Sequence, residues 1–66
     1  MTANRLSRIF IGSTLEADKI AAWINDVNQN EVVVEVKDQF EIRNYIYMYL
    51  LFHDEHVLAE YILKVE

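Results

Sequence analysis

The residues best suited to bind a metal ion lie in one short segment, His53-Asp54-Glu55-His56. Imidazole and carboxylate groups are common ligands of zinc and other transition metals. His53 and His56 could share an ion, with Glu60 one helical turn farther on. The same residues also suit a helix start, where Asp54 is the N-cap and Glu55 complements the positive helix end. We favour the helix start and expect no metal ligands here.

A second candidate site is the strand-to-helix turn Gly12-Ser13-Thr14. Backbone N–H groups at the start of a helix can hold a phosphate or another anion. Ser13 also begins an S-x-x-E capping box with Glu16, in which each side chain accepts a hydrogen bond from the other residue's backbone N–H. The Glu16 carboxylate would compete with an external anion. Gly12, Ser13 and Thr14 therefore form an alternative anion or small-ligand site beside the capping box.

The sequence offers little support for catalysis. It contains no cysteine and a single glycine, so a thiol nucleophile, a disulfide and a glycine-rich phosphate loop are all lacking. No other nucleophile stands in a recognisable catalytic motif. We expect a non-catalytic protein without a cofactor.

Composition narrows the class of protein further. The chain has 66 residues, 53% of them hydrophobic, and a net charge of −5, which fits one small domain over residues 1–66. Nucleic-acid binding needs clustered Lys and Arg, whereas the six such residues here are scattered. Met1–Arg5 leads into no signal-peptide pattern, and no apolar run approaches the roughly 20 residues of a membrane span. We expect a cytoplasmic protein that binds neither nucleic acid nor membrane, with residues 1–4 as a flexible tail.

Hydrophobic periodicity predicts five elements in the order β-α-β-β-α. The first helix has an apolar stripe that includes Ala17, Ile20 and Ile24, and Asn28 or Asn30 would end it in a left-handed conformation. Residues 38–44 are predicted to connect the second and third strands, with a tight hairpin as one option. The expected strands are Arg5–Ile11, Val32–Lys37 and Tyr45–Phe52, and the expected helices cover residues 13–27 and the segment from Glu55 onward.

The order of these elements predicts an α+β two-layer sandwich. A right-handed strand–helix–strand crossover makes the first two strands parallel. The third strand, which is the most apolar, fits between them and antiparallel to both. The sheet order is then 1-3-2, with both helices on one face and the other face open.

The third strand, Tyr45–Phe52, is apolar on both sides and therefore needs cover on both. We place Ile46, Met48, Leu50 and Phe52 beneath the helices, together with Ile9 and Ile11 of the first strand. Leu6, Arg8 and Phe10 then point to the open face, as do Val33, Glu35 and Lys37. The predicted interface residues are Phe10, Val33, Tyr45, Tyr47, Tyr49 and Leu51.

Such an open face suits binding to another protein. Soluble monomers rarely expose contiguous apolar patches above a few hundred Å², and aromatic residues are enriched at interfaces. We therefore expect a homodimer, formed face to face or along a sheet edge, with an unknown further protein partner as an option. The tail Met1–Asn4 is too short to cover three strands. The aromatic residues would also suit base stacking on RNA, but the acidic charge opposes that function.

Two helical segments resemble those of a known family. Glu16, Ala17 and Ile20 match a Glu-Ala-x-x-Ile helix, and Glu55 with Ala59 matches an Asp-x-x-x-Ala segment with Glu in place of Asp. On these residues the chain resembles the small bacterial signal-transducing proteins, a domain family of unknown function with a PII-like, ferredoxin-type fold. The resemblance implies a regulatory role and assigns no ligand-binding residues.

Together these observations predict a small dimeric interaction or regulatory module. The alternative is a sensor of a small ligand or anion, which would bind at the Gly12–Glu16 turn or in a groove of the dimer.

Overall fold

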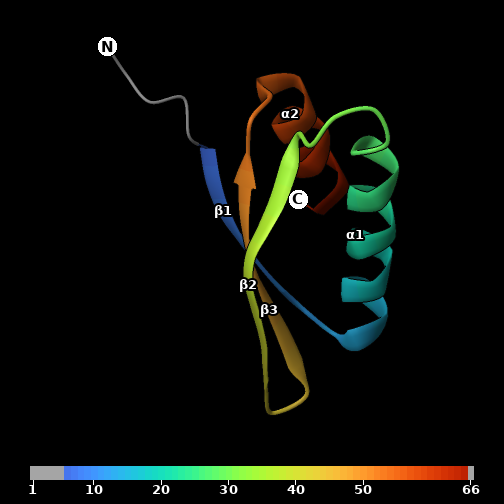
Figure 1. Cartoon of the computed structure of the whole chain (residues 1–66). Helices are drawn as coiled ribbons and strands as arrows, with labels where there is room; N and C mark the ends of the chain where they lie inside the picture. The colour runs from blue at the N-terminus through green and yellow to red at the C-terminus, as the bar shows by residue number, and fades with distance from the viewer. Residues whose placement is uncertain (1–5, 66) are drawn as a thin grey trace.

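The computed structural model describes residues 6–65, which form a three-stranded sheet and two helices (Figure 1). The elements are β1 (Leu6–Gly12), α1 (Thr14–Val27), β2 (Val34–Ile42), β3 (Tyr45–Phe52) and α2 (Glu55–Val65). β3 is the central strand, and β1 and β2 each pair with it in antiparallel orientation. The predicted α+β class, element order and 1-3-2 sheet are confirmed. The tail predicted over residues 1–4 lies outside the described residues.

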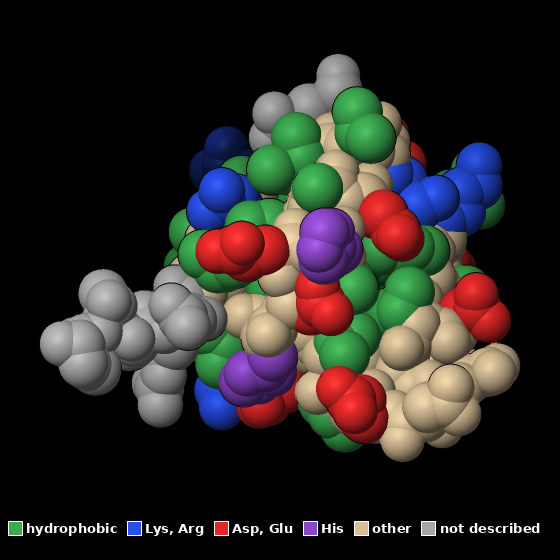
Figure 2. Space-filling model, turned by 90° about the horizontal axis from the view of Figure 1, so that it is seen from above, with side chains coloured by type: hydrophobic (Ala, Val, Ile, Leu, Met, Phe, Trp, Pro, Cys, Tyr) green, Lys and Arg blue, Asp and Glu red, His purple; other side chains and the backbone are tan. Residues whose placement is uncertain are grey.

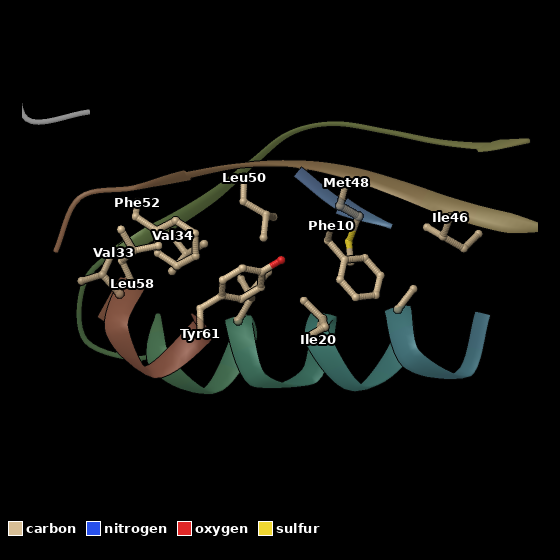
Figure 3. Close-up of a cluster of buried hydrophobic side chains, with 12 residues drawn as sticks. Phe10, Ile20, Val33, Val34, Ile46, Met48, Leu50, Phe52, Leu58 and Tyr61 are labelled. Carbon is tan, nitrogen blue, oxygen red and sulfur yellow. The ribbon is translucent and has the colours of Figure 1, made fainter. Parts of the chain in front are cut away.

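The hydrophobic core lies between the sheet and the helices, which both cover the same face (Figure 3). Tyr61 of α2 links the two layers, because its ring centroid lies 5.2 Å from that of Phe52 in β3 and 6.1 Å from that of Trp23 in α1. The predicted inner face of β3 and the apolar stripe of α1 are confirmed. The largest fully buried side chains are Phe52, Met48, Leu50 and Val34.

Both helices begin at the side-chain caps that the sequence predicts. The Ser13 N–H donates to Glu16 Oε1 (2.8 Å), and the Glu16 N–H donates to Ser13 Oγ (3.2 Å), which completes the capping box. At the start of α2, Asp54 Oδ1 accepts from the backbone N–H groups of His56 (2.8 Å) and Val57 (3.4 Å). These side chains supply partners for helix-start N–H groups that have none within the helix.

Asn28 ties the end of α1 to the start of β2. Its Oδ1 accepts from the backbone N–H groups of Val33 (2.9 Å) and Val34 (3.1 Å), and its Nδ2 donates to the Val34 carbonyl (2.8 Å). Its φ is −91°, so the left-handed cap expected at Asn28 or Asn30 is wrong. The hydrogen bonds that the Asn28 side chain makes to the start of β2 explain why an asparagine occupies this position.

A tight hairpin joins β2 and β3 through the loop Arg43-Asn44. Both residues have positive φ, 53° and 72° respectively. A two-residue loop with positive φ at both positions is a type I′ turn, whose twist matches that of the paired strands. β2 therefore continues to Ile42, and the predicted connection over residues 38–44 is wrong except for its last two residues. The tight-hairpin option is confirmed.

An irregularity at Lys37 decides which way the end of β2 faces. Val36 and Asp38 pair with consecutive residues of β3, so Lys37 is the extra residue of a β-bulge. An extra residue shifts the two-residue alternation of a strand by one position. Phe40 and Ile42 consequently point away from the helices.

The orientation predicted for β1 is wrong. Phe10 pairs with Met48 on the inner face and is 7% exposed, whereas Ile9 and Ile11 are 55% and 56% exposed. Alternation could not decide between the two sides, because both are apolar. Gly12 helps to explain the outcome: a Cβ there would lie 2.6 Å from Phe10 Cζ, so the glycine leaves room for the buried ring.

The prediction for Val33 is also wrong. It precedes β2 and is buried in the core, and its carbonyl accepts a hydrogen bond from the His53 N–H (2.8 Å). On β1, Leu6 packs against the core and Arg8 shares its side of the strand. Phe10 and Val33 are therefore core residues and do not contribute to the open face.

Candidate interaction surface

The sheet face that points away from the helices carries a contiguous set of apolar side chains. Paired residues on neighbouring strands share a face, and Ile9 and Ile11 pair with Tyr49 and Tyr47. Within residues 6–65, both helices lie on the opposite side of the sheet (Figures 1 and 3). We call this set the outer sheet face. It consists of Ile9, Ile11, Phe40, Ile42, Tyr45, Tyr47 and Tyr49.

Aromatic rings pack against one another in the middle of the outer sheet face. The rings of Phe40 and Tyr47 stack with a centroid distance of 5.2 Å and an interplanar angle of 5°. The Phe40 ring also lies 5.9 Å from that of Tyr49, tilted by 37°. Rings held in this way lose little conformational freedom when a partner binds.

The outer sheet face remains largely accessible. Exposed fractions run from 37% for Phe40 to 56% for Ile11, and Tyr47 is half-buried. The predicted interface residues Tyr45, Tyr47 and Tyr49 lie on this face. Leu51 also points outward, opposite Ser7 and Glu35, but its neighbours leave it only 8% exposed.

Charged groups border the outer sheet face near Leu51, and Asp38 also points outward, opposite Tyr49. Glu35 Oε2 lies 2.7 Å from His53 Nε2, and Glu35 Oε1 accepts from Lys37 Nζ at 3.3 Å. These two contacts, led by the one with His53, lower the pKa of the Glu35 carboxyl from its usual 4.5. An apolar centre with a polar rim is the usual plan of a protein–protein interface.

The segment His53–His56 is organised as a helix start. Asp54 is the cap of α2, and His53 contacts Glu35. The two histidine side chains, purple in Figure 2, lie apart with an acidic side chain between them. In the part of the chain that the structure describes, no three His, Cys, Asp or Glu residues are placed to share a metal ion.

The turn Gly12-Ser13-Thr14 holds a carboxylate from its own helix. Glu16 Oε1 accepts the Ser13 N–H, and this hydrogen bond is the main reason why the pKa of Glu16 lies below its usual 4.5. The Glu16 N–H donates a hydrogen bond to Ser13 Oγ. An external anion would have to displace this carboxylate.

Four residues of the outer sheet face differ from the sequence-based prediction. The prediction places Ile9 and Ile11 beneath the helices and Phe40 and Ile42 in a connection, whereas all four point outward. Val34, Val36, Phe40 and Ile42 do show a two-residue spacing that indicates a longer strand. The bulge at Lys37, however, has no clear signature in the sequence.

Comparisons with protein-family models, curated proteins and solved structures found no match to this chain. Neither helix of the described residues is long and apolar enough to cross a membrane.

Proposed function

We propose that the protein is a small, non-catalytic interaction module that forms a homodimer through its outer sheet face. The observation that carries this proposal is the contiguous set of exposed apolar side chains from all three strands. The central strand β3 is apolar on both of its faces, so both faces must be shielded from water by other parts of the structure or by a partner. A second copy supplies an identical apolar surface, and two-fold pairing is the commonest form of protein self-association.

The size of the face favours a reversible dimer. Three strands at about 4.8 Å spacing, with about eight residues each rising about 3.3 Å, make a face of roughly 14 by 26 Å. Interfaces that bury less than about 1,200 Å² in total are typical of transient complexes. We therefore expect dimerisation to depend on protein concentration.

We further propose that the dimer has a regulatory role in the cytoplasm. The resemblance of its helices to those of the small bacterial signal-transducing proteins supports this role, with Glu16, Ala17 and Ile20 carrying the first part of the resemblance. At the end of the molecule seen in Figure 2, acidic side chains are dispersed among other residues. A third possibility, an inhibitor that presents one continuous acidic surface to a basic partner, is less favoured because of this dispersion.

The test is the absolute mass of the protein, measured by light scattering during size-exclusion chromatography over a range of concentrations. Tyr49→Glu places a charge at the centre of the face, and Leu63→Glu adds the same charge on α2, where Leu63 is 83% exposed. We expect the parent and Leu63→Glu to move toward the dimer mass as concentration rises, and Tyr49→Glu to remain a monomer. A parent that stays monomeric, or a Tyr49→Glu protein that dimerises as the parent does, would refute the proposal.

A further inference from the structure

A second feature of the molecule is a groove along the free edge of β1. Its volume is about 520 Å³. β1 forms one wall, and the first half of α1 and the last turn of α2 form the others. We call it the β1-edge groove. Its lining consists of the apolar residues Ile9, Phe10, Ile11, Ile20, Tyr61 and Val65 and the charged residues Arg8, Glu16, Lys19 and Lys64, so Ile9 and Ile11 border both this groove and the outer sheet face.

The groove exists because the sheet is narrower than the layer of helices. Two helices, each about 10 Å across, cover about 20 Å. Three strands spaced about 4.8 Å apart cover about 14 Å. The difference of about 6 Å corresponds to one more strand, and the groove at β1 marks where the space lies.

The edge of β1 can also receive another strand. In the described part of the chain, β1 pairs only with β3, through the register Leu6–Phe52 to Gly12–Ile46. Alternate residues of a strand direct their N–H and C=O groups to opposite edges, so every second residue of β1 points these groups away from β3. An extended peptide can pair with such an edge by main-chain hydrogen bonds.

The charge of the groove indicates which peptide would fit. Arg8, Lys19 and Lys64 line it, which is half of the six Lys and Arg residues of a chain with net charge −5. Among the described residues of the lining, Glu16 supplies the one carboxylate, and its Oε1 already accepts from the Ser13 N–H. The groove is therefore a locally cationic site on an acidic protein.

We propose that the β1-edge groove binds an extended acidic segment of another protein as a fourth strand. Carboxylates at the groove-facing positions of the segment would pair with Lys19 and Lys64. Apolar side chains at the alternate positions would then lie on the other side of the sheet, beside Ile9 and Ile11. A second copy of this chain is a poorer occupant, because two-fold pairing along β1 would bring the cations of two such grooves together.

The proposal can be tested with a synthetic peptide of alternating valine and glutamate, matched in length to the seven residues of β1. Binding is followed by amide NMR shifts of the isotope-labelled protein. We expect shifts along β1, and no binding of a valine–lysine peptide of equal length. A valine–glutamate peptide with N-methylated backbone amides should also fail, because it cannot donate to the strand edge.

Two double variants test the role of charge. Lys19→Glu with Lys64→Glu reverses both helix cations of the groove and should weaken peptide binding about tenfold or more, because two attractive ion pairs are replaced by two repulsive contacts. Lys37→Glu with Arg43→Glu makes the same change in net charge at two residues outside the groove lining and should bind nearly as the parent does. Circular dichroism confirms that both variants fold.

Several results would overturn the proposal. They are equal binding of the lysine peptide, equal loss of affinity in the two double variants, and peptide-induced shifts confined to the outer-face residues of β2 and β3. Concentration-dependent shifts at Ile9 and Ile11 without Ile42, in the absence of peptide, would assign the edge to a second copy instead. Tyr49→Glu should bind the peptide as the parent does, because Tyr49 does not line the groove. Peptide binding and dimerisation can therefore fail separately.

Discussion

Phe10 is the residue that sets the orientation of β1, and through it the composition of both sheet faces. Its ring is buried in the core beside Met48, and Gly12 leaves the space for it. Ile9 and Ile11 are thereby turned to the outer sheet face. The sequence places apolar side chains on both sides of this strand, so only packing against the helices separates the two orientations.

This orientation of β1 predicts that two neighbouring substitutions lower the free energy of unfolding by different amounts. Phe10→Ala should lower the free energy of unfolding by about 3–5 kcal/mol, because it removes a buried ring and leaves a cavity. Ile9→Ala should cost less than about 1 kcal/mol in the monomer, because Ile9 is 55% exposed. Urea denaturation at low protein concentration measures both. Equal costs, or a larger cost at Ile9, would mean that β1 has the opposite orientation.

Glu16 gives the protein a predictable response to acid. Its pKa is lowered in the folded state, chiefly by the hydrogen bond from the Ser13 backbone, so its charged form favours folding. The contribution is complete above the unfolded pKa near 4.5 and is lost as the pH falls through the lower folded value. The pKa of Glu35 is lowered as well. Comparing the parent with Glu16→Gln isolates the contribution of Glu16.

We expect the parent to be more stable than Glu16→Gln at neutral pH and the difference to shrink below pH 4.5. Urea midpoints measured across this range provide the test. A difference that stays constant down to about pH 2 would show that the Glu16 carboxylate has the same pKa in the folded and unfolded states.

At the scale of elements, the hairpin turn carries backbone strain that a substitution can relieve. Arg43 has φ 53°, a conformation that asparagine and glycine adopt more readily than other residues. Arg43→Asn should therefore raise the free energy of unfolding by about 0.5–1 kcal/mol, whereas Arg43→Val should lower it by about 1 kcal/mol or more. Thermal denaturation of the two variants measures the contrast. The same melting temperature for both would exclude this turn geometry.

The elements also show how far the sequence predicts this fold. The element order and the sheet order can be predicted from a few features of the sequence. These are the two caps at Ser13 and Asp54, the apolar stripe of α1 and the apolar third strand. The length of β2 is harder to predict than the order of the elements, because Arg43-Asn44 lacks the glycine that usually marks a type I′ turn. The bulge at Lys37 then reversed the alternation, so the contribution of Phe40 and Ile42 to the candidate surface required the structure.

At the scale of the whole molecule, two surfaces of different character meet at Ile9 and Ile11 of β1. The outer sheet face is broad and mostly apolar and aromatic, with the carboxylate residue Asp38 opposite Tyr49, which suits reversible association with an identical copy. The β1-edge groove is cationic and follows an edge strand, which suits an acidic extended segment. A dimer through the face would leave the edge of each copy available, so one assembly could bind two segments.

If the outer sheet face joins two copies, as we propose, isoleucine methyl groups report on the contact directly. Ile9, Ile11 and Ile42 lie on the face, whereas Ile20, Ile24 and Ile46 lie in the core. The measurement is the NMR shift of these methyl groups as the isotope-labelled protein is diluted. We expect concentration-dependent shifts at the three outer residues and constant signals from the three core residues. Constant signals throughout, or shifts at Ile9 and Ile11 without Ile42, would contradict it, the latter by placing the contact along the β1 edge.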